Sequence, residues 1–364
     1  MHSAALPPDL RTIAREATRN GRPLPAPART ARIVGLGHHV PPEVVPNGPI
    51  AERIGVDDAW IVKRTGIKSR RRAAPADRLS DLATFAGRRA LADAGVDPLD
   101  VDLVLVATMT PDEITPNAAP LVAHELGAET AGAIDIGAAC TGWLAALRLA
   151  AGQVETGRAD RVLVIGAEVL TRLIDFDDQK TAALFGDGAG AVVVGADGGG
   201  ERSGDERRGE AGDERASARQ TRGRIGPIVL AADGGLGDRI TCANDERVLR
   251  MDGHSTYQVA VKRLSEATVA AVARAGLELE DVDLFVYHQA NGRIIRAVGE
   301  RLDLQPARVA DYVAHMANTS AASIPLTLSL LREDGRLRPG QKVMIAAIGA
   351  GFTWGAGVIE WGLA

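Results

Sequence analysis

Cys140 is a candidate nucleophile. It lies within AIDIGAACTGWLAALRLAAG, residues 133–152, a pattern that predicts a buried strand, a tight turn of small residues and then a helix. At a helix N-terminus the unsatisfied N–H groups and the macrodipole favour a thiolate, and the same N–H groups can bind an oxyanion formed on an acylated cysteine. Cysteine is also a small hydrophobe that protein cores often bury, so the residue type alone does not decide between these two interpretations.

His288 and Asn318 are candidate hydrogen-bond donors. His288 follows a predicted strand at 284–287 and opens the sequence HQAN. α/β proteins usually place reactive groups at the carboxyl ends of strands. His288 is therefore a candidate because of its position, and not simply because it is a histidine. The chain has seven histidines, of which His254 and His315 compete for this role. Asn318 precedes Thr-Ser and a predicted helix, where it could donate from its amide or serve as an ordinary helix cap.

Short apolar runs that alternate with helical patterns must position these side chains. Several runs are almost continuously apolar, which is typical of strands covered on both faces of a sheet. One helix is predicted from an N-cap at Ser80, and a single face of it carries Leu82, Phe85, Ala86 and Ala90. The strand candidates are Ile33–Leu36, Leu103–Ala107, Ala133–Ile136, Val162–Ile165, Ala191–Val194, Ile228–Ala231, Leu284–Tyr287, Val343–Ala347 and Val358–Trp361.

The chain contains an internal repeat. LADAGVDPLDVDLVLVAT, from Leu91, aligns with VARAGLELEDVDLFVYHQ, from Val272, at an offset of 181 residues and with seven of 18 positions identical. At the same offset, RVLVIGAE from Arg161 aligns with KVMIAAIG from Lys342. The repeat predicts a duplicated α/β unit whose two halves pack into one body.

The repeat also relates the candidate residues to one another. The offset aligns Ala321 with Cys140, so the turn at Asn318 and the turn at Cys140 are expected to be pseudo-symmetric. Each turn precedes a predicted helix. A site formed where the two halves meet would bring both turns together.

Two segments fall outside the duplicated unit. Residues 1–30 are rich in proline and arginine and predict a peripheral N-terminal extension with one short helix at about 10–19. Residues 197–223 have alanine as their only apolar residue type, which predicts a disordered, charged surface loop, with a docking tail as the functional alternative. The rest divides into an N-terminal half, 31–196, and a C-terminal half, 224–364.

Composition limits the classes of function. Hydrophobic residues make up 46% and charged residues 24%, which is typical of a globular protein, and the net charge of −5 argues against a nucleic-acid binder. Cys140 and Cys242 make no disulfide framework, and no Cys/His cluster suggests a metal. No apolar run reaches the roughly 20 residues of a membrane span, and no signal-peptide core is present. These features predict a cytoplasmic protein with no metal, membrane or nucleic-acid partner.

Six motifs together resemble those of one family. DIGAACTGW, YHQAN, NTSAASIP and GAGFTWGAG, with WIVKRTGIKSR from Trp60 and FGDGAGAVVV from Phe185, are similar to motifs of β-ketoacyl-acyl-carrier-protein synthase III. They follow the family's order over roughly residues 31–364, apart from the charged insertion. The resemblance implies an α/β thiolase fold, with two pseudo-symmetric halves in a five-layered αβαβα arrangement, and a homodimer.

The resemblance also implies a decarboxylative Claisen condensation that initiates fatty acid synthesis without a metal or redox cofactor. Cys140 would attack an acyl-CoA and hold the acyl group as a thioester. His288 and Asn318 would donate hydrogen bonds to the thioester carbonyl of malonyl-acyl-carrier-protein and stabilise the enolate left by decarboxylation. The oxyanion of the acyl group would be bound by backbone N–H groups of Cys140, Ala350 and Gly351.

Further contacts are implied at the mouth of the site. Trp60 and Arg172 match family positions that stack on the adenine of CoA, and Arg64 lies in the same motif. Arg293 matches a position that contacts the acidic carrier protein. The residues that would extend this docking patch, or else form a plain solvated helix face, are Arg296 and Lys262.

Some positions depart from the family pattern. Thr115 replaces a bulky Phe that caps the acyl pocket, which predicts a longer or branched acyl channel. His254 replaces an Asn of the pantetheine contact, and Gln258 replaces a basic docking residue. Ala350 makes the oxyanion turn Gly-Ala-Gly, with less backbone freedom than three glycines.

Two other functions remain to be separated from the first. A priming synthase or acyltransferase of a polyketide or other secondary-metabolite pathway would keep the fold and Cys140. Genomic neighbours and carbon dioxide release would distinguish it. A silent partner subunit would have lost part of the Cys-His-Asn set, and all three residues are present.

Overall fold

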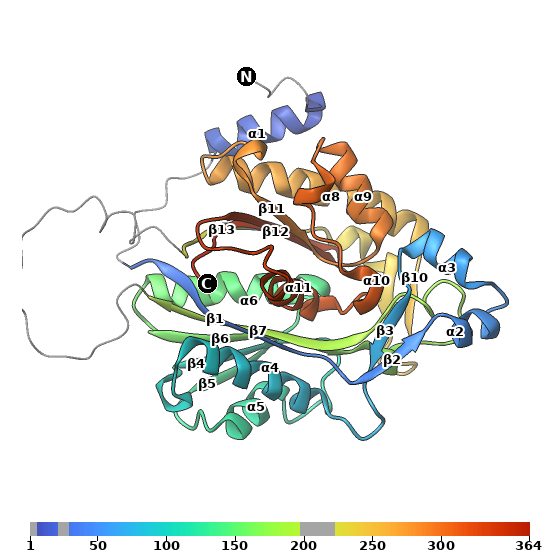
Figure 1. Cartoon of the computed structure of the whole chain (residues 1–364), viewed down its shortest axis with the longest axis horizontal. Coiled ribbons are helices and arrows are strands. Elements are labelled where there is room, and N and C mark those ends of the chain that lie inside the picture. The colour runs from blue at the N-terminus through green and yellow to red at the C-terminus, as the bar shows by residue number, and fades with distance from the viewer. Residues whose placement is uncertain (1–5, 21–28, 197–222) are drawn as a thin grey trace, which may run out of the picture.

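The computed structural model describes residues 6–20, 29–196 and 223–364. Two mixed sheets stack with helical layers outside and between them (Figure 1). The five-layered αβαβα arrangement predicted from the sequence is confirmed. The predicted charged loop, 197–223, lies outside the described residues except for Gly223.

The first sheet comes from the N-terminal half. Its order is β1-β7-β6-β4-β5, with β4 parallel to β5 and β6, and β7 antiparallel to both of its neighbours. The outer helices are α4 (Leu79–Ala94) and α5 (Ala118–Leu126). The strands are Ala31–His39 (β1), Leu103–Ala107 (β4), Gly132–Ile136 (β5), Arg161–Val169 (β6) and Asp187–Ala196 (β7).

The second sheet comes from the C-terminal half. Its order is β11-β12-β13-β8, with β11 parallel to β12 and the other pairs antiparallel. Between the sheets lie α6 (Gly142–Glu155) and α11 (Ser323–Glu333), and the outer layer holds α8 (Gly253–Arg274) and α9 (Gly292–Arg301). The strands are Ile225–Ala232 (β8), Leu284–Tyr287 (β11), Lys342–Gly349 (β12) and Thr353–Glu360 (β13).

All nine predicted strands lie in these two sheets, although the last was predicted to reach Trp361 and ends at Glu360. Apolar side chains of both sheets pack against the two central helices. Together these side chains form the largest core cluster among the described residues. The middle layer is therefore buried on both sides. Since α6 and α11 both begin within this layer, their N-terminal turns are brought into the centre of the molecule.

The helix predicted from Ser80 differs in its start and in its buried face. It begins at Leu79 with Arg78 as N-cap, because the Asp112 carboxylate accepts hydrogen bonds from the backbone N–H groups of Leu79 and Ser80. Phe85 is 45% exposed rather than buried.

The position of Phe85 follows from how closely α4 approaches β1. A Cβ added at Gly35 would lie 2.3 Å from the carbonyl oxygen of Ala90. At this separation only small side chains fit between helix and strand, so the large ring is turned outward.

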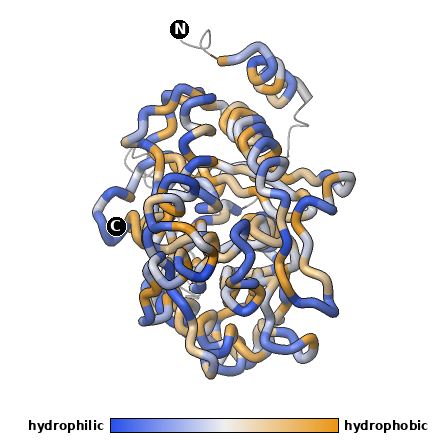
Figure 2. Tube along the Cα trace, turned by 90° about the vertical axis from the view of Figure 1, so that its right-hand side faces the viewer, coloured by the Kyte–Doolittle hydropathy of each residue, from blue (hydrophilic) through white to orange (hydrophobic). Residues whose placement is uncertain are grey.

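The short N-terminal helix is confirmed as α1 (Pro8–Asn20), which lies at one end of the molecule (Figures 1 and 2) and packs on α8 (Figure 1). Leu10 is completely buried in the core cluster beneath α8. Asp9 also forms an ion pair with Arg301 of α9, at 2.5 Å. This helix therefore packs on the outer helical layer of the C-terminal half.

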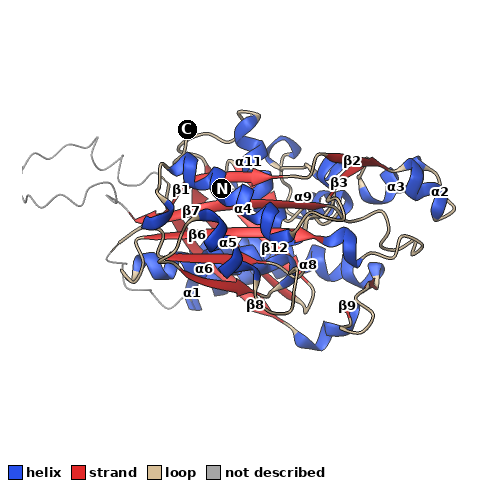
Figure 3. Cartoon of the chain, turned by 90° about the horizontal axis from the view of Figure 1, so that it is seen from below, coloured by secondary structure: helices blue, strands red, loops and turns tan. Residues whose placement is uncertain are grey.

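Small elements that were not predicted project at one end of the body (Figure 3). Their bounds are Glu43–Pro46 (β2), Gly48–Arg53 (α2), Asp58–Thr65 (α3), Ser69–Arg72 (β3), Ile240–Cys242 (β9), Leu249–Met251 (β10) and Val313–Met316 (α10). Three of them, α3, β9 and β10, contribute residues to the lining of the cavity described below. Among the described residues, no helix is long and apolar enough to cross a membrane.

Candidate active site

Cys140 lies at the predicted strand–turn–helix. β5 ends at Ile136, a 3-10 turn spans Ala139–Thr141, and α6 follows. Ala139 has a φ of 45°, which tightens the turn and places the thiol on the cavity wall. Gly349 at the end of β12 comes so close that an added Cβ would lie 2.7 Å from the Cys140 backbone nitrogen.

The surroundings of the thiol favour its protonated form. Burial raises the pKa of Cys140 to about 12, although the Ser320 hydroxyl lowers it and the charge of Glu168 raises it further. We expected the helix N-terminus to favour a thiolate, and desolvation outweighs that effect in the free protein.

His288 is held rigidly at the end of β11. Its backbone N–H donates to Ala346 of β12, and its Nδ1 lies 2.8 Å from Ser323 Oγ. The ring is buried and lines the cavity. Burial lowers the pKa of His288 to about 3, so the imidazole is neutral at physiological pH. A neutral imidazole can still donate a hydrogen bond from one nitrogen.

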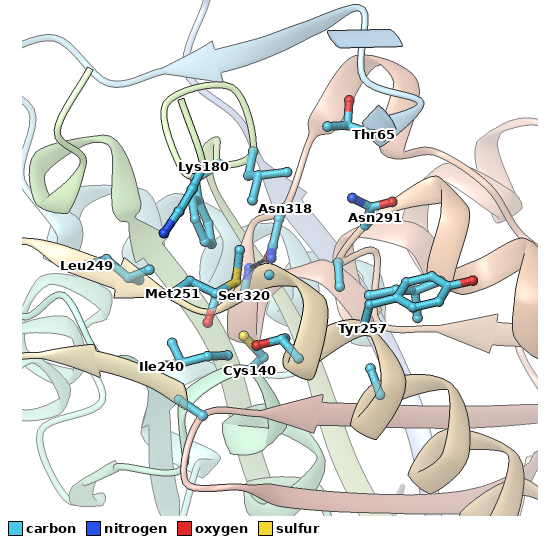
Figure 4. Close-up of a pocket in the computed structure, with 18 of the residues that line it drawn as sticks. Thr65, Cys140, Lys180, Ile240, Leu249, Met251, Tyr257, Asn291, Asn318 and Ser320 are labelled. Carbon is cyan, nitrogen blue, oxygen red and sulfur yellow. Dashed lines mark hydrogen bonds between the residues drawn. The ribbon is translucent and has the colours of Figure 1, made fainter. Parts of the chain in front are cut away.

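Asn318 faces the same cavity as Cys140 (Figure 4). Its side-chain Oδ1 accepts a hydrogen bond from Ser320 N at 2.8 Å. Its backbone is tied to the neighbouring segment, because Asn318 N donates to Leu184 O and Asn318 O accepts from Gly186 N. With Oδ1 committed to a backbone donor, the amide nitrogen is left to donate to a ligand.

These three residues share one cavity of about 530 Å³. The structure thus brings Cys140, His288 and Asn318 together, as their positions in the two repeats predicted. Ala350 also lines this cavity, whereas Gly351 is not among the described residues that do. The cavity lining includes the apolar side chains of Met109, Leu170, Ile240, Leu249 and Met251.

Aromatic and cationic side chains gather toward the mouth of the cavity. The Arg64 guanidinium stacks on Trp60 at 4.1 Å from the ring centroid, and both residues line the cavity. Arg293 stacks on Tyr257 at 5.3 Å. Lys180 enters from the side opposite Tyr257 in Figure 4. His254, the departure noted in the sequence, lines the same cavity.

The structure does not bring Arg172 to this mouth. Its guanidinium binds the Asp112 carboxylate and the backbone oxygen of Asp77, which turns it toward α4. Gln179 and Lys180 line the cavity instead. The resemblance implied that Arg172 stacks, together with Trp60, on the adenine of CoA, whereas in this structure the Arg172 guanidinium is engaged by Asp112.

Three other residues predicted for the site are not among the described residues that line the cavity. Thr115 is exposed on the loop that follows Asp112, away from the cavity of its own chain. Lys262 on α8 and Arg296 on α9 are exposed on the outer helical layer, and Arg296 lies one helical turn after Arg293. Arg296 and Lys262 can therefore act only on a surface partner.

Two buried residues near the thiol were missed by the sequence reasoning. Glu168 is completely buried on β6, and its Oε2 accepts hydrogen bonds from Thr110 Oγ1 at 2.7 Å and Met109 N at 3.2 Å. Burial raises the pKa of Glu168 to about 7. Ser320 lies between the two halves and lines the cavity. The available signal for Glu168 was an acidic residue inside the otherwise uncharged run 162–169.

Charged groups elsewhere do not suggest a metal centre. Within the described ranges, no group of three or more His, Cys, Asp or Glu side chains is arranged to hold a metal ion. Both cysteines are free of disulfide bonds.

A thiol set opposite two hydrogen-bond donors, between pseudo-symmetric α/β halves, is the arrangement of thiolase-fold condensing enzymes. The family described as 3-oxoacyl-[acyl-carrier-protein] synthase III matches residues 134–208, and its C-terminal part matches residues 272–361. The chain belongs to the β-ketoacyl-acyl-carrier-protein synthase III family.

Individual relatives agree over almost their whole length. β-Ketoacyl-[acyl-carrier-protein] synthase III 2 of Streptomyces coelicolor is 41% identical, covering 91% of this chain and 94% of that protein. The synthase III of Rhodospirillum rubrum is 43% identical, covering 90% and 98%.

Solved structures give the same result. The 3-oxoacyl-[acyl-carrier-protein] synthase III of Aquifex aeolicus has a TM-score of 0.82 at 36% identity, covering 91% of this chain and all of that one. The priming β-ketosynthase of the R1128 polyketide pathway has a TM-score of 0.82 at 35% identity, covering 93% and 99%. The predicted thiolase fold is confirmed, and the chain is an acyl-transferring condensing enzyme.

Proposed function

We propose that this protein condenses an acyl-CoA with malonyl-acyl-carrier-protein to give a 3-oxoacyl-acyl-carrier-protein, the step that initiates fatty acid synthesis. The observation that carries this proposal is the convergence of Cys140, His288 and Asn318 on one cavity. The names of the relatives, which are β-ketoacyl-[acyl-carrier-protein] synthases III, support a 3-oxoacyl product on a carrier protein.

In the first step Cys140 accepts the acyl group. Its sulfur forms a bond to the acyl carbonyl carbon while the bond to the CoA sulfur breaks, and the thiol proton ends on the departing CoA. The Cys140 N–H and the Ala350 N–H are the donors that would hold the oxyanion, since both residues line the cavity. Exchange of one thioester for another requires no oxidant or reductant.

In the second step the donors His288 and Asn318 act on malonyl-acyl-carrier-protein. They hydrogen-bond the thioester carbonyl, so that loss of carbon dioxide leaves an enolate stabilised by two fixed dipoles. The enolate carbon attacks the acyl carbonyl on Cys140. The carbon–sulfur bond to Cys140 then breaks, and the sulfur takes up a proton to restore the thiol.

The mouth suits the nucleotide end of CoA. Trp60 and Arg64 already form a stacked pair that can receive a flat base. Lys180 lines the same cavity and can meet a phosphate of CoA, whereas the Arg172 guanidinium is engaged by Asp112. Arg293, with the exposed Arg296 and Lys262 on the same outer layer, forms a cationic surface that suits an acidic carrier protein.

We also propose a homodimer in the cytoplasm. β5 is an edge strand of its sheet, and Ile134 on it is 52% exposed. Ile114 on the neighbouring loop is 90% exposed. Pairing of two copies at this edge would cover both side chains. Thr115 would then face a second copy, which is the one way in which it could shape an acyl pocket.

The intact mass of the protein after incubation with acyl-CoAs from acetyl to long-chain tests the first step. Wild type should gain one acyl group, and Cys140→Ala should gain none. Addition of malonyl-acyl-carrier-protein should release carbon dioxide and produce a 3-oxoacyl-carrier product. If no donor acylates wild type, the proposal fails. A preference confined to acetyl-CoA would contradict the longer or branched acyl channel predicted from Thr115.

The structural similarity to a priming polyketide synthase favours one alternative. That role would use the same residues with a carrier protein from a secondary-metabolite pathway. The two functions are separated by offering wild type both kinds of malonyl-loaded carrier protein and comparing kcat/KM. Acyl transfer to either carrier without carbon dioxide release would point to a simple acyltransferase.

A further inference from the structure

The contacts of Ser323 determine how the proton of His288 is placed. Ser323 is the first residue of α11, and its Oγ lies 2.8 Å from His288 Nδ1. The same oxygen accepts a hydrogen bond from Gln289 N at 2.9 Å. His288, Gln289 and Ser323 are each only 1% exposed, so these groups have little contact with solvent.

Counting hydrogens leaves one arrangement in which every group is satisfied. The Gln289 N–H can only donate, so it occupies a lone pair of Ser323 Oγ. The serine has one hydroxyl hydrogen, and among the described residues the acceptor within reach is His288 Nδ1. If Nδ1 carried the proton instead, the hydroxyl hydrogen would be buried without an acceptor, and an unsatisfied buried donor destabilises that arrangement.

We propose that Ser323 is a positioning residue that fixes His288 as the tautomer with its proton on Nε2. The ring then always presents an N–H donor to the cavity. It is also prevented from acting as a proton acceptor there.

Gln289 is itself immobilised, so Ser323 has a fixed reference. Its Nε2 donates to Tyr287 O at 2.8 Å, and its Oε1 accepts from Tyr312 N at 2.7 Å. The serine hydroxyl is therefore directed by a rigid backbone N–H. Asn318 is oriented in a similar way, because its Oδ1 accepts a hydrogen bond from the backbone N–H of Ser320. In both donor residues, a hydrogen bond at one polar atom, Nδ1 of His288 or Oδ1 of Asn318, fixes the direction of the N–H group on the remaining side-chain nitrogen.

The other half of the molecule shows that the fold does not require this pair. At the 181-residue offset, Ser323 corresponds to Gly142 and His288 corresponds to Ala107. A Cβ added at Gly142 would lie 3.2 Å from the Ala107 Cβ, so both halves bring these positions into contact. In the first half the contact is apolar, and only the second half carries the hydrogen-bonded pair.

This inference rests on the proposed function, because it concerns the donor used on the malonyl thioester. It predicts a loss confined to one half-reaction. Ser323→Ala should lower the kcat of malonyl-acyl-carrier-protein decarboxylation by at least about tenfold, since the ring can then adopt the other tautomer. Acylation of Cys140 should stay within about twofold of wild type. Ser323→Thr keeps a hydroxyl and should restore part of the decarboxylation.

Helix α11 offers a matched control. Ser329 is also a buried serine, and its Oγ lies 2.7 Å from His38 Nδ1, outside the cavity. Ser329→Ala removes the same kind of hydrogen bond from the same helix and should leave both half-reactions unchanged. Equal losses of decarboxylation in the two variants would mean that Ser323 acts only through the stability of the helix.

The tautomer can be read directly in wild type, where no variant needs to fold. Nitrogen NMR of protein with labelled histidine should show a pyridine-type Nδ1 and a pyrrole-type Nε2 for His288, assigned by their loss in His288→Ala. A pyrrole-type Nδ1 would overturn the inference even if the enzyme condenses as proposed. Absence of decarboxylation and condensation in wild type would instead contradict the proposed function.

Discussion

The two halves of the molecule share a backbone but not a chemistry. Adding 181 to the residue numbers carries the turn Ala139–Thr141 onto the turn Ser320–Ala322, and the start of α6 onto the start of α11. Ala139 and Ser320 also share a left-handed φ, of 45° and 47°. The same tight turn therefore occurs twice, on either side of the cavity.

The side chains on these turns differ. The first turn presents Cys140, whereas the second has Ala321 at the matching position, 1% exposed and outside the cavity lining among the described residues. The second half supplies His288 and Asn318 instead. A duplicated backbone thus allows one copy to hold the acyl group while the other drives decarboxylation.

Moving the thiol from one turn to the other would break this comparison most severely. Cys140→Ala should abolish acylation, and the double variant Cys140→Ala/Ala321→Cys should not restore it, because position 321 is buried. Intact mass after incubation with acyl-CoA measures the adduct. Ala321→Cys alone should still gain one acyl group on Cys140. An adduct on the double variant would mean that the two turns are chemically interchangeable.

The contact between the halves at Cys140 N is expected to have the next largest effect. Gly349→Ala places a Cβ 2.7 Å from that nitrogen and should slow acylation by about 10–100-fold, since an oxyanion donor is displaced. The control is Gly137→Ala, between β5 and the turn that carries Cys140, where an added Cβ meets nothing within 4 Å. Rapid mixing with acyl-CoA gives the two rates. Equal acylation rates for the two variants would mean that the C-terminal half does not contribute to the acylation of Cys140.

Glu168 belongs to the first half, and its charge raises the pKa of the Cys140 thiol beyond the effect of burial. Glu168→Gln should therefore lower that pKa and speed alkylation by iodoacetamide up to about tenfold. Because burial raises the pKa of Glu168 to about 7, wild type carries the charge only above that pH. The difference should appear above about pH 7 and vanish below it. Both proteins should carry Cys242→Ser, so that alkylation of the second thiol does not contribute. Identical dependence of the alkylation rate on pH with and without Glu168→Gln would contradict an effect of the Glu168 charge.

The smallest expected effect concerns the mouth. Lys180→Ala should raise the KM for acyl-CoA by about threefold, the size expected of one exposed ion pair. Arg172→Ala should leave that KM unchanged, because its guanidinium is turned toward Asp112. Steady-state kinetics at low salt checks both variants. A raised KM for Arg172→Ala with an unchanged KM for Lys180→Ala would instead identify Arg172 as the nucleotide contact.

How well the sequence predicted these features depended on the range of the interactions involved. The nine strands and the turns at Cys140 and Asn318 followed from local apolar patterns and from the repeat. Arg172 was misplaced because its partner Asp112 is 60 residues away and leaves no local signal. Phe85 was assigned to the buried face because helical periodicity cannot report how closely β1 approaches α4.

The hydrogen-bond partners of the site were equally invisible in the sequence. Ser323 is one of several small polar residues in NTSAASIP, and its relation to His288 spans 35 residues. The elements β2, β3, β9 and β10 are too short to show a period. These features follow from packing between distant segments, which composition and periodicity do not encode.

The division of labour between the halves is tested most directly by measuring both half-reactions on Cys140→Ala and Asn318→Ala. Cys140→Ala should keep decarboxylation of malonyl-acyl-carrier-protein and lose acylation by acyl-CoA. Asn318→Ala should keep acylation and lose decarboxylation by about 10²–10³-fold. Loss of both activities in both correctly folded variants would contradict the division and show that the two turns act as one inseparable unit.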